Sequence, residues 1–144
     1  MRFLLDINVV IALIDLDHLF HDRSHAWWEL AKHDGWASCP LTENGVVRIM
    51  SHPNYGDTES YSVKEVVGWL TSFSGNTDHE FWADDLSLND PQIFDHGRIL
   101  GSKQITDLYL LALAVSRNAV FVTFDQTIST AAVRNALPGH LLTI

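Results

Sequence analysis

The sequence has little of several features that mark common protein classes. It holds one cysteine, Cys39, in 144 residues, which excludes an internal disulfide and a fold built on disulfides. Cys39 lies in the apolar segment WASCP, so we expect a buried structural thiol rather than a nucleophile. The chain has no run near the roughly 18 apolar residues that a membrane span requires. Internal repeats and low-complexity segments are also missing, which leaves an ordinary globular domain.

The N-terminus resembles a signal peptide only in part. Arg2 precedes the apolar run FLLDINVVIALI, but Asp6 and Asn8 interrupt it. No small-residue cleavage site follows the run. We therefore expect a cytoplasmic protein without a membrane contact.

Positive charge is scarce. Nine Lys and Arg residues stand against 18 Asp and Glu, and the formal net charge is −9. Proteins that bind nucleic acids through the phosphates usually carry a basic face, so electrostatic binding of a long polyanion is disfavoured. A metal-bridged contact to one phosphate of a nucleic acid stays open, and Arg98 and Lys103 are the candidate cations for that contact.

The composition and the order of apolar segments predict one α/β domain over residues 1–144. Hydrophobic residues make up 47% and charged residues 19%, which is typical of a compact protein. Short apolar runs alternate with helical stretches, and this predicts a central parallel sheet of four or five strands covered on both faces. The predicted strands are Phe3 to Leu5, Trp36 to Ser38, Phe81 to Ala83, Val120 to Phe124 and Leu141 to Thr143.

Capping residues predict where the helices begin. Asn8 is expected to cap VVIAL, and Thr106 to cap the apolar, buried helix DLYLLALAVSR. Thr42 is expected to open ENGVVRIM, and Ser62 and Glu65 have capping-box spacing ahead of VVGWLTSF. A further helix is predicted in SHAWWELAKH, and residues 51–60 are predicted to form a surface loop.

Four acidic residues stand beside these elements. Asp6 and Asp125 follow predicted strands, in LLDINV and VFVTFDQ. Glu43 and Asp107 begin predicted helices, in PLTENG and ITDLYLLALAV, where the helix dipole favours a carboxylate. In open parallel sheets the ligand crevice lies beyond the carboxyl ends of the strands, so these acids can share one site.

Gathered carboxylates indicate a divalent metal. They repel one another unless a cation is bound, and hard oxygen ligands suit Mg²⁺ or Mn²⁺. Metal-assisted hydrolysis of a phosphodiester uses such a site. Each acid alone also has a structural explanation: Asp6 as a cap, Glu43 and Asp107 as first-turn acids that complement helix dipoles, and Asp125 as the start of a loop. Their joint placement favours the metal site.

The chain resembles the PIN-domain ribonucleases, and most closely the VapC toxins of bacterial toxin–antitoxin pairs. The resemblance rests on four segments in order: LLDINVVIAL, GWASCPLTENGVVRIMS, QITDLYLLALA and VFVTFDQ. It implies a three-layer α/β/α sandwich of PIN type and an Mg²⁺- or Mn²⁺-dependent endoribonuclease. It also implies a cognate VapB-like antitoxin and a homodimer. By this resemblance the catalytic and metal-binding acids are Asp6, Glu43, Asp107 and Asp125, with Asn8 and Thr106 as supporting polar residues.

Two other interpretations are weighed against this one. His21 and His25 have the spacing of the zinc motif HExxH, but an aspartate replaces its glutamate and no third ligand follows, so packed or surface histidines are favoured. Trp27 and Trp28 are expected to pack within the fold rather than to stack on bases. The competing function is a PIN-like protein-binding module without hydrolytic activity.

Overall fold

The sheet is parallel throughout. In the computed structural model, which describes residues 1–57 and 60–144, five strands are ordered β3-β2-β1-β4-β5. The strands are β1 (Phe3–Leu5), β2 (Trp36–Ser38), β3 (His79–Phe81), β4 (Val120–Thr123) and β5 (Leu141–Thr143). The predicted parallel sheet is therefore confirmed, and four of its strands lie where the sequence indicates.

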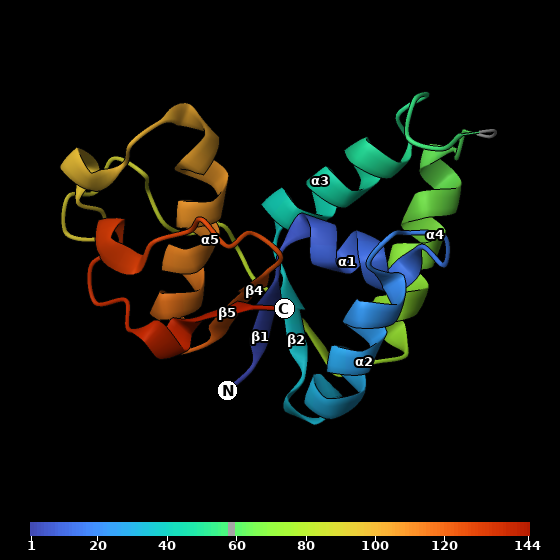
Figure 1. The fold of residues 1–144 in the computed structure, drawn as a ribbon, viewed down its shortest axis with the longest axis horizontal. Helices are drawn as coiled ribbons and strands as arrows, with labels where there is room; N and C mark the ends of the chain where they lie inside the picture. The colour runs from blue at the N-terminus through green and yellow to red at the C-terminus, as the bar shows by residue number, and fades with distance from the viewer. Residues whose placement is uncertain (58–59) are drawn as a thin grey trace.

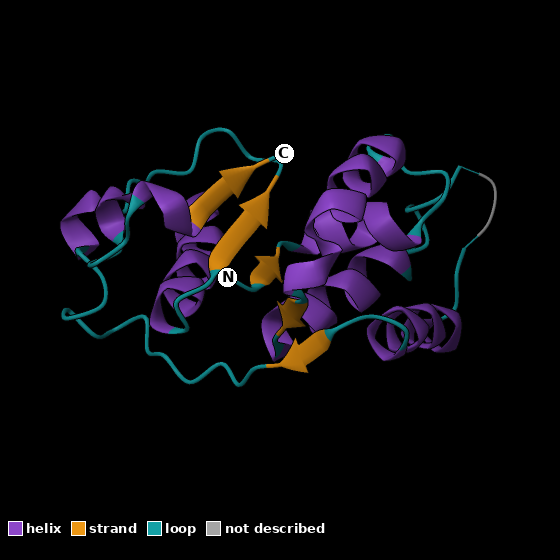
Figure 2. Cartoon of the chain, turned by 90° about the horizontal axis from the view of Figure 1, so that it is seen from below, coloured by secondary structure: helices purple, strands orange, loops and turns teal. Residues whose placement is uncertain are grey.

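Helices cover both faces of the sheet. One layer contains α1 (Ile7–Ile14), α2 (His21–Ala31), α3 (Pro40–Met50) and α4 (Val63–Gly75), and the other contains α5 (Ile105–Ser116) with several 3₁₀ turns (Figure 1). Figure 2 shows the strands passing between the two layers. Alternate strand residues divide between two cores, because side chains on a strand point to opposite faces. Leu4 and Phe121 pack with α5, whereas Leu5 and Val122 pack with α1.

The third strand was predicted two residues too late. It spans His79–Phe81, and the buried Trp82 that suggested a strand there lies just beyond its end. Among the described residues this strand pairs with β2 alone, at one edge of the sheet, and its side chains are mostly exposed. Only Phe81 of its three residues is apolar, so β3 lacks the apolar run that located the other four strands.

Three predicted helix starts are wrong. Asp6, and not Asn8, is the N-cap of α1, and its side chain accepts the Ile7 N–H. Helix α5 begins at Ile105, directly after the 3₁₀ turn Ser102–Gln104, so Thr106 lies inside it. Helix α3 begins at Pro40, whose fixed φ suits a first turn, and Thr42 is its third residue.

Other local predictions are confirmed. Ser62 and Glu65 form a reciprocal capping box at the start of α4. Trp28 is buried, and Trp27 packs edge-on against Phe3 with ring centroids 5.3 Å apart. Cys39 is fully buried, and burial raises the pKa of its thiol to about 11. The predicted loop at 51–60 forms turns, except that residues 58 and 59 lie outside the described residues.

The histidines of HDRSH hold the end of a helix. His21 Nδ1 lies 2.7 Å from the Ala12 carbonyl oxygen, and His25 Nε2 lies 3.0 Å from that of Leu13. Both carbonyls belong to the last turn of α1, where intrahelical donors run out. The prediction that these histidines pack within the fold is thus confirmed.

The topology creates one crevice at the carboxyl ends of the strands. From β1 the chain proceeds through α1 and α2 to β2, whereas β4 lies on the other side of β1 and is reached through α5 on the opposite face. The strand order therefore reverses between β1 and β4, which is where open α/β sheets bind ligands. Within one helical layer α1 and α3 approach closely, because a Cβ on Gly45 would lie 2.3 Å from Ile7 Cδ1. No helix among the described residues is long and apolar enough to cross a bilayer.

Candidate active site

Three of the predicted acids line one pocket at this reversal point. Asp6 follows β1, Asp125 lies just beyond β4, and Asp107 lies in the first turn of α5. The pocket they share has a volume of about 180 Å³. Carboxylates from three separate elements therefore meet at the position that the topology reserves for a ligand.

Asp6 is the most firmly held of the three. Its Oδ1 accepts the Ile7 N–H at 2.7 Å, and its Oδ2 accepts the Thr123 hydroxyl at 2.7 Å. The residue is 7% exposed. Burial raises its pKa, the two hydrogen bonds oppose that rise, and the charge of Asp125 adds to it, so that the net pKa is raised.

Asp107 carries an uncompensated charge. Burial, and then the neighbouring charges of Asp6 and Asp125, raise its pKa to about 6. Within residues 1–57 and 60–144 no group donates a hydrogen bond to its carboxylate, so both oxygens remain available. At neutral pH this carboxylate is mostly ionised and repelled by its neighbours, and a bound cation would relieve that repulsion.

Asp125 is fixed by its own loop. Its Oδ1 accepts the Thr127 N–H at 2.8 Å and the Thr127 hydroxyl at 2.6 Å. These bonds lower the pKa of Asp125. Its backbone N–H donates to Thr123 Oγ1 at 3.1 Å, so Thr123 joins Asp6 to Asp125.

Thr123 is the supporting residue that the sequence interpretation missed. The available signal was its place in VFVTFDQ, as the one polar residue of an apolar strand and two positions before the acid. Asn8 and Thr106, the supporting residues predicted instead, do line the pocket. In the described part of the chain neither of them donates a hydrogen bond to an acid.

Glu43 lies apart from the three aspartates. Its Oε1 accepts the Ser38 hydroxyl at 2.6 Å, and Ser38 Oγ lies 2.8 Å from His79 Nε2. It lines a different pocket, of about 540 Å³, between α3 and α4. Among the residues that the structure describes, no group of three or more His, Cys, Asp or Glu side chains stands ready to hold a metal ion.

The donor set nevertheless fits a hard divalent cation. The shared pocket presents carboxylate oxygens, the ligand type that Mg²⁺ and Mn²⁺ prefer. Burial and then the charges of Asp6 and Asp125 raise the pKa of Asp107, and a bound cation would offset both effects. Asp6 and Asp107 would be the principal ligands, because burial raises the pKa of both carboxyls, whereas Asp125 already accepts hydrogen bonds from its own loop.

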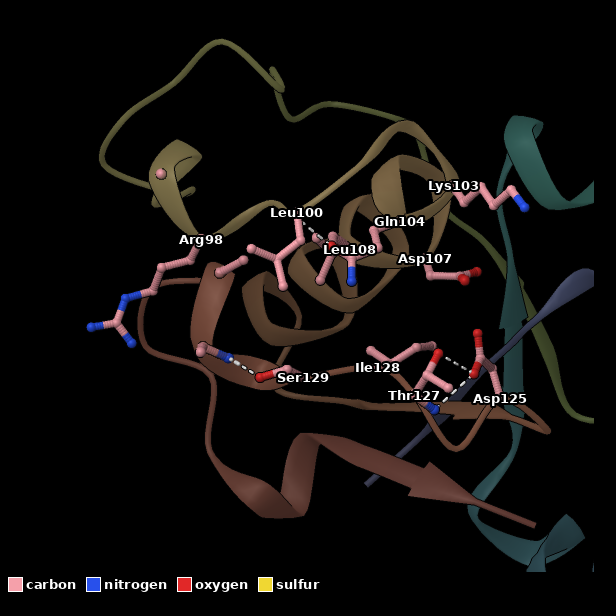
Figure 3. A pocket seen from close by; sticks show the side chains of 13 residues that line it. Arg98, Leu100, Lys103, Gln104, Asp107, Leu108, Asp125, Thr127, Ile128 and Ser129 are labelled. Carbon is pink, nitrogen blue, oxygen red and sulfur yellow. Dashed lines mark hydrogen bonds between the residues drawn. The ribbon is translucent and has the colours of Figure 1, made fainter.

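A second, larger pocket opens directly beside these acids. Its volume is about 480 Å³, and Asp107 and Asp125 line one end of it. Figure 3 shows both carboxylates facing the same space, with Lys103 on the side of α3. Arg98 lies at the far end, pairs with Asp95 at 3.2 Å and points away from the acids. The two predicted RNA-contacting cations therefore border this pocket at opposite ends.

The PIN-domain model matches residues 3–133, which include all four acids. Ribonuclease VapC44 from Mycobacterium tuberculosis is 44% identical over 144 residues and covers all of both chains. The chain belongs to the VapC group of PIN-domain proteins. Ribonuclease VapC38 from the same organism is 37% identical over 142 residues, with 98% of each chain covered. A crystal structure of VapBC2 from Rickettsia felis, bound to a DNA fragment from its promoter, has a TM-score of 0.53 and covers 87% of this chain and 89% of its own. At 16% identity that likeness shows the PIN fold alone.

Proposed function

We propose that this PIN-domain protein is a metal-dependent endoribonuclease and the toxin of a toxin–antitoxin pair. The observation that carries the proposal is the meeting of Asp6, Asp107 and Asp125 in one pocket at the point where the strand order reverses. The names of the relatives support the reaction, since full-length sequences at 44% and 37% identity are called ribonucleases. The substrate is RNA, and the reaction is hydrolysis of its phosphodiester bonds.

We assign different roles in metal binding to the four acids. Asp6 and Asp107 are the core ligands of Mg²⁺ or Mn²⁺, and Asp125 is a more peripheral ligand held by its loop. When bound, the ion lowers the pKa of the attacking water and stabilises negative charge on the phosphate. Because Ser38 holds Glu43 in the neighbouring pocket, Glu43 acts from the rim, and its replacement should reduce cleavage less.

Supporting residues and partners complete the proposal. Thr123 orients Asp6 and Asp125, while Asn8 and Thr106 shape the wall of the pocket. Lys103, exposed and beside Asp107, contacts the RNA backbone, and Arg98 contacts RNA farther from the acids. A cognate VapB-like antitoxin holds the toxin inactive, the toxin forms a homodimer, and it acts on RNA in the cytoplasm.

RNA cleavage by the purified protein tests the function. Cleavage of single-stranded RNA should require Mn²⁺ or Mg²⁺ and stop in EDTA. Asp6→Asn and Asp107→Asn keep the shape of the side chain but remove a charged ligand, so each should slow cleavage by on the order of 10²-fold or more.

Asp22→Asn is the matched control. Asp22 is an exposed acid in the first turn of α2, as Asp107 is an acid in the first turn of α5. This variant should cleave like the parent. A parent protein that binds no Mn²⁺ and cleaves no RNA would instead be the PIN-like binding module.

A further inference from the structure

The larger pocket beside the acids has the character of a site for a flat ring. Apart from Asp107 and Asp125 at one end, its walls are mostly apolar, and they are formed by Leu100, Leu108, Ile128, Ala131 and Ala132. Its volume of about 480 Å³ lies within the usual range for small-ligand pockets, which combine apolar walls with a few placed polar groups. Leu100 is 85% exposed at this pocket, and a ring packed against it would cover that apolar surface.

We propose that this pocket binds one base of the RNA whose phosphate lies at the acids, and that Gln104 selects a base presenting keto oxygens, guanine or uracil. The inference rests on the endoribonuclease function proposed above. The shared acids Asp107 and Asp125 connect the two sites, since both residues line both pockets. A nucleotide with its phosphate at the acids therefore places its base at the apolar walls.

The orientation of the Gln104 amide is set by a backbone contact. Its Oε1 lies 2.9 Å from the Leu100 backbone nitrogen, and that N–H needs an acceptor. The Gln104 nitrogen therefore keeps both of its protons for a ligand. Figure 3 shows this nitrogen pointing into the pocket toward Ile128. No acceptor among the described residues takes either proton.

Ser129, which also lines this pocket, supplies a second hydrogen-bond donor. Ser129 Oγ accepts the Ala131 N–H at 3.2 Å, which leaves the Ser129 hydroxyl proton to donate. Away from the acidic end, the polar side chains that face the pocket thus act as donors. Guanine offers the acceptor O6 and uracil the acceptor O4, whereas adenine and cytosine carry amino groups, N6 and N4, at the matching positions. An amino group facing the Gln104 nitrogen would place two hydrogen-bond donors opposite each other, with no acceptor between them.

Gln104→Glu tests this directly. One carboxylate oxygen still accepts the Leu100 N–H, while the other replaces the donor with an acceptor of nearly the same shape. The probe is a random-sequence pool of single-stranded RNA cleaved in Mn²⁺, with the 5′ ends of the fragments sequenced. We expect the parent to favour guanine or uracil at one position near the cut, and Gln104→Glu to shift that ratio toward adenine or cytosine by about tenfold or more.

Two further variants separate charge from recognition. Gln126→Glu adds the same charge beside Asp125 but outside the pocket, so the base preference should not change. Gln104→Leu adds no charge and should flatten the preference at that position. Equilibrium binding of fluorescent RNA oligonucleotides that differ in one base gives the same comparison for a variant that binds without cleaving.

The outcomes separate a failure of the base site from a failure of the proposed endoribonuclease function. If the parent cleaves no RNA, the proposed function fails. If the parent cleaves, but both Gln104 variants keep its base preference in cleavage or in binding, the base site is wrong. In that case the pocket would instead bind an apolar side chain of a protein partner, and the Gln104 donor would not affect that binding.

Discussion

Replacing Asp107 by Asn should stabilise the protein in the absence of metal. The carboxylate has no hydrogen-bond donor among the described residues, so the amide forfeits no bond and removes a repelled charge. The folded-state pKa of about 6 lies above the ordinary value of 3.8. Ionisation therefore opposes folding at any pH above about 6, and the penalty fades as the pH falls from 6 toward 3.8.

The size of the effect follows from that pKa difference. Each pKa unit corresponds to about 1.4 kcal/mol, so the rise gives at most about 3 kcal/mol. Solvent screening at a half-buried group and the loss of a favourable charge at the N-terminus of α5 reduce this to about 1–2 kcal/mol. For 144 residues this corresponds to a melting temperature about 3–6 °C higher.

Thermal unfolding in EDTA at pH 8 and at pH 4.5 checks the prediction. The variant should melt above the parent at pH 8, and the difference should shrink at pH 4.5. Asp125→Asn is the control with the opposite sign, because hydrogen bonds from Thr127 lower the pKa of Asp125 and its charge is stabilising. If Asp107→Asn melts below the parent at pH 8, or shows the same difference at both pH values, the electrostatic account of the site is refuted.

Four further outcomes are expected. Mn²⁺ at one hundred times its dissociation constant should stabilise the parent by about 2.7 kcal/mol in thermal melts, and Asp6→Asn should lose most of that gain. Thr123→Val removes a buried donor to Asp6 and should lower the free energy of unfolding in urea by about 1–3 kcal/mol. Ser62→Ala breaks the capping box of α4 and should cost about 1 kcal/mol in the same assay, without changing cleavage. Lys103→Glu should weaken RNA binding and flatten its salt dependence more than Arg98→Glu, whose guanidinium already pairs with Asp95; equal effects would contradict that order.

The sheet was largely predictable because its inner strands are buried. The apolar runs at Phe3–Leu5 and Val120–Thr123 have neighbours on both sides, so packing requires hydrophobic residues there. Of the two edge strands, β5 still carries two leucines and was located, whereas β3 (His79–Phe81) has one exposed phenylalanine and gives a weak apolar signal. The start of α1 was misplaced because Asp6 directly follows the strand and caps the helix, which leaves no intervening turn for Asn8 to occupy.

The site was predictable at the level of backbone position and less so at the level of side chains. Strand ends and helix starts placed Asp6, Asp107 and Asp125 around one crevice, and the structure has them lining one pocket. The direction of Glu43 depends on Ser38, a partner five residues earlier that lies at the end of another element. Such a tertiary hydrogen bond leaves no periodic trace in the sequence.

Helix α1 is held by hydrogen bonds at both ends, and its folding should therefore be cooperative with that of its neighbours. A helix of eight residues does not persist alone in water, and this one is capped by Asp6 at its start and by imidazoles of α2 at its end. The two ends lie about 12 Å apart. Helix α1 therefore forms only together with α2 and the sheet, and its amides should exchange with solvent through unfolding of the whole domain. The position of the Asp6 carboxylate therefore depends on His21 and His25, which do not line the pocket of the three acids.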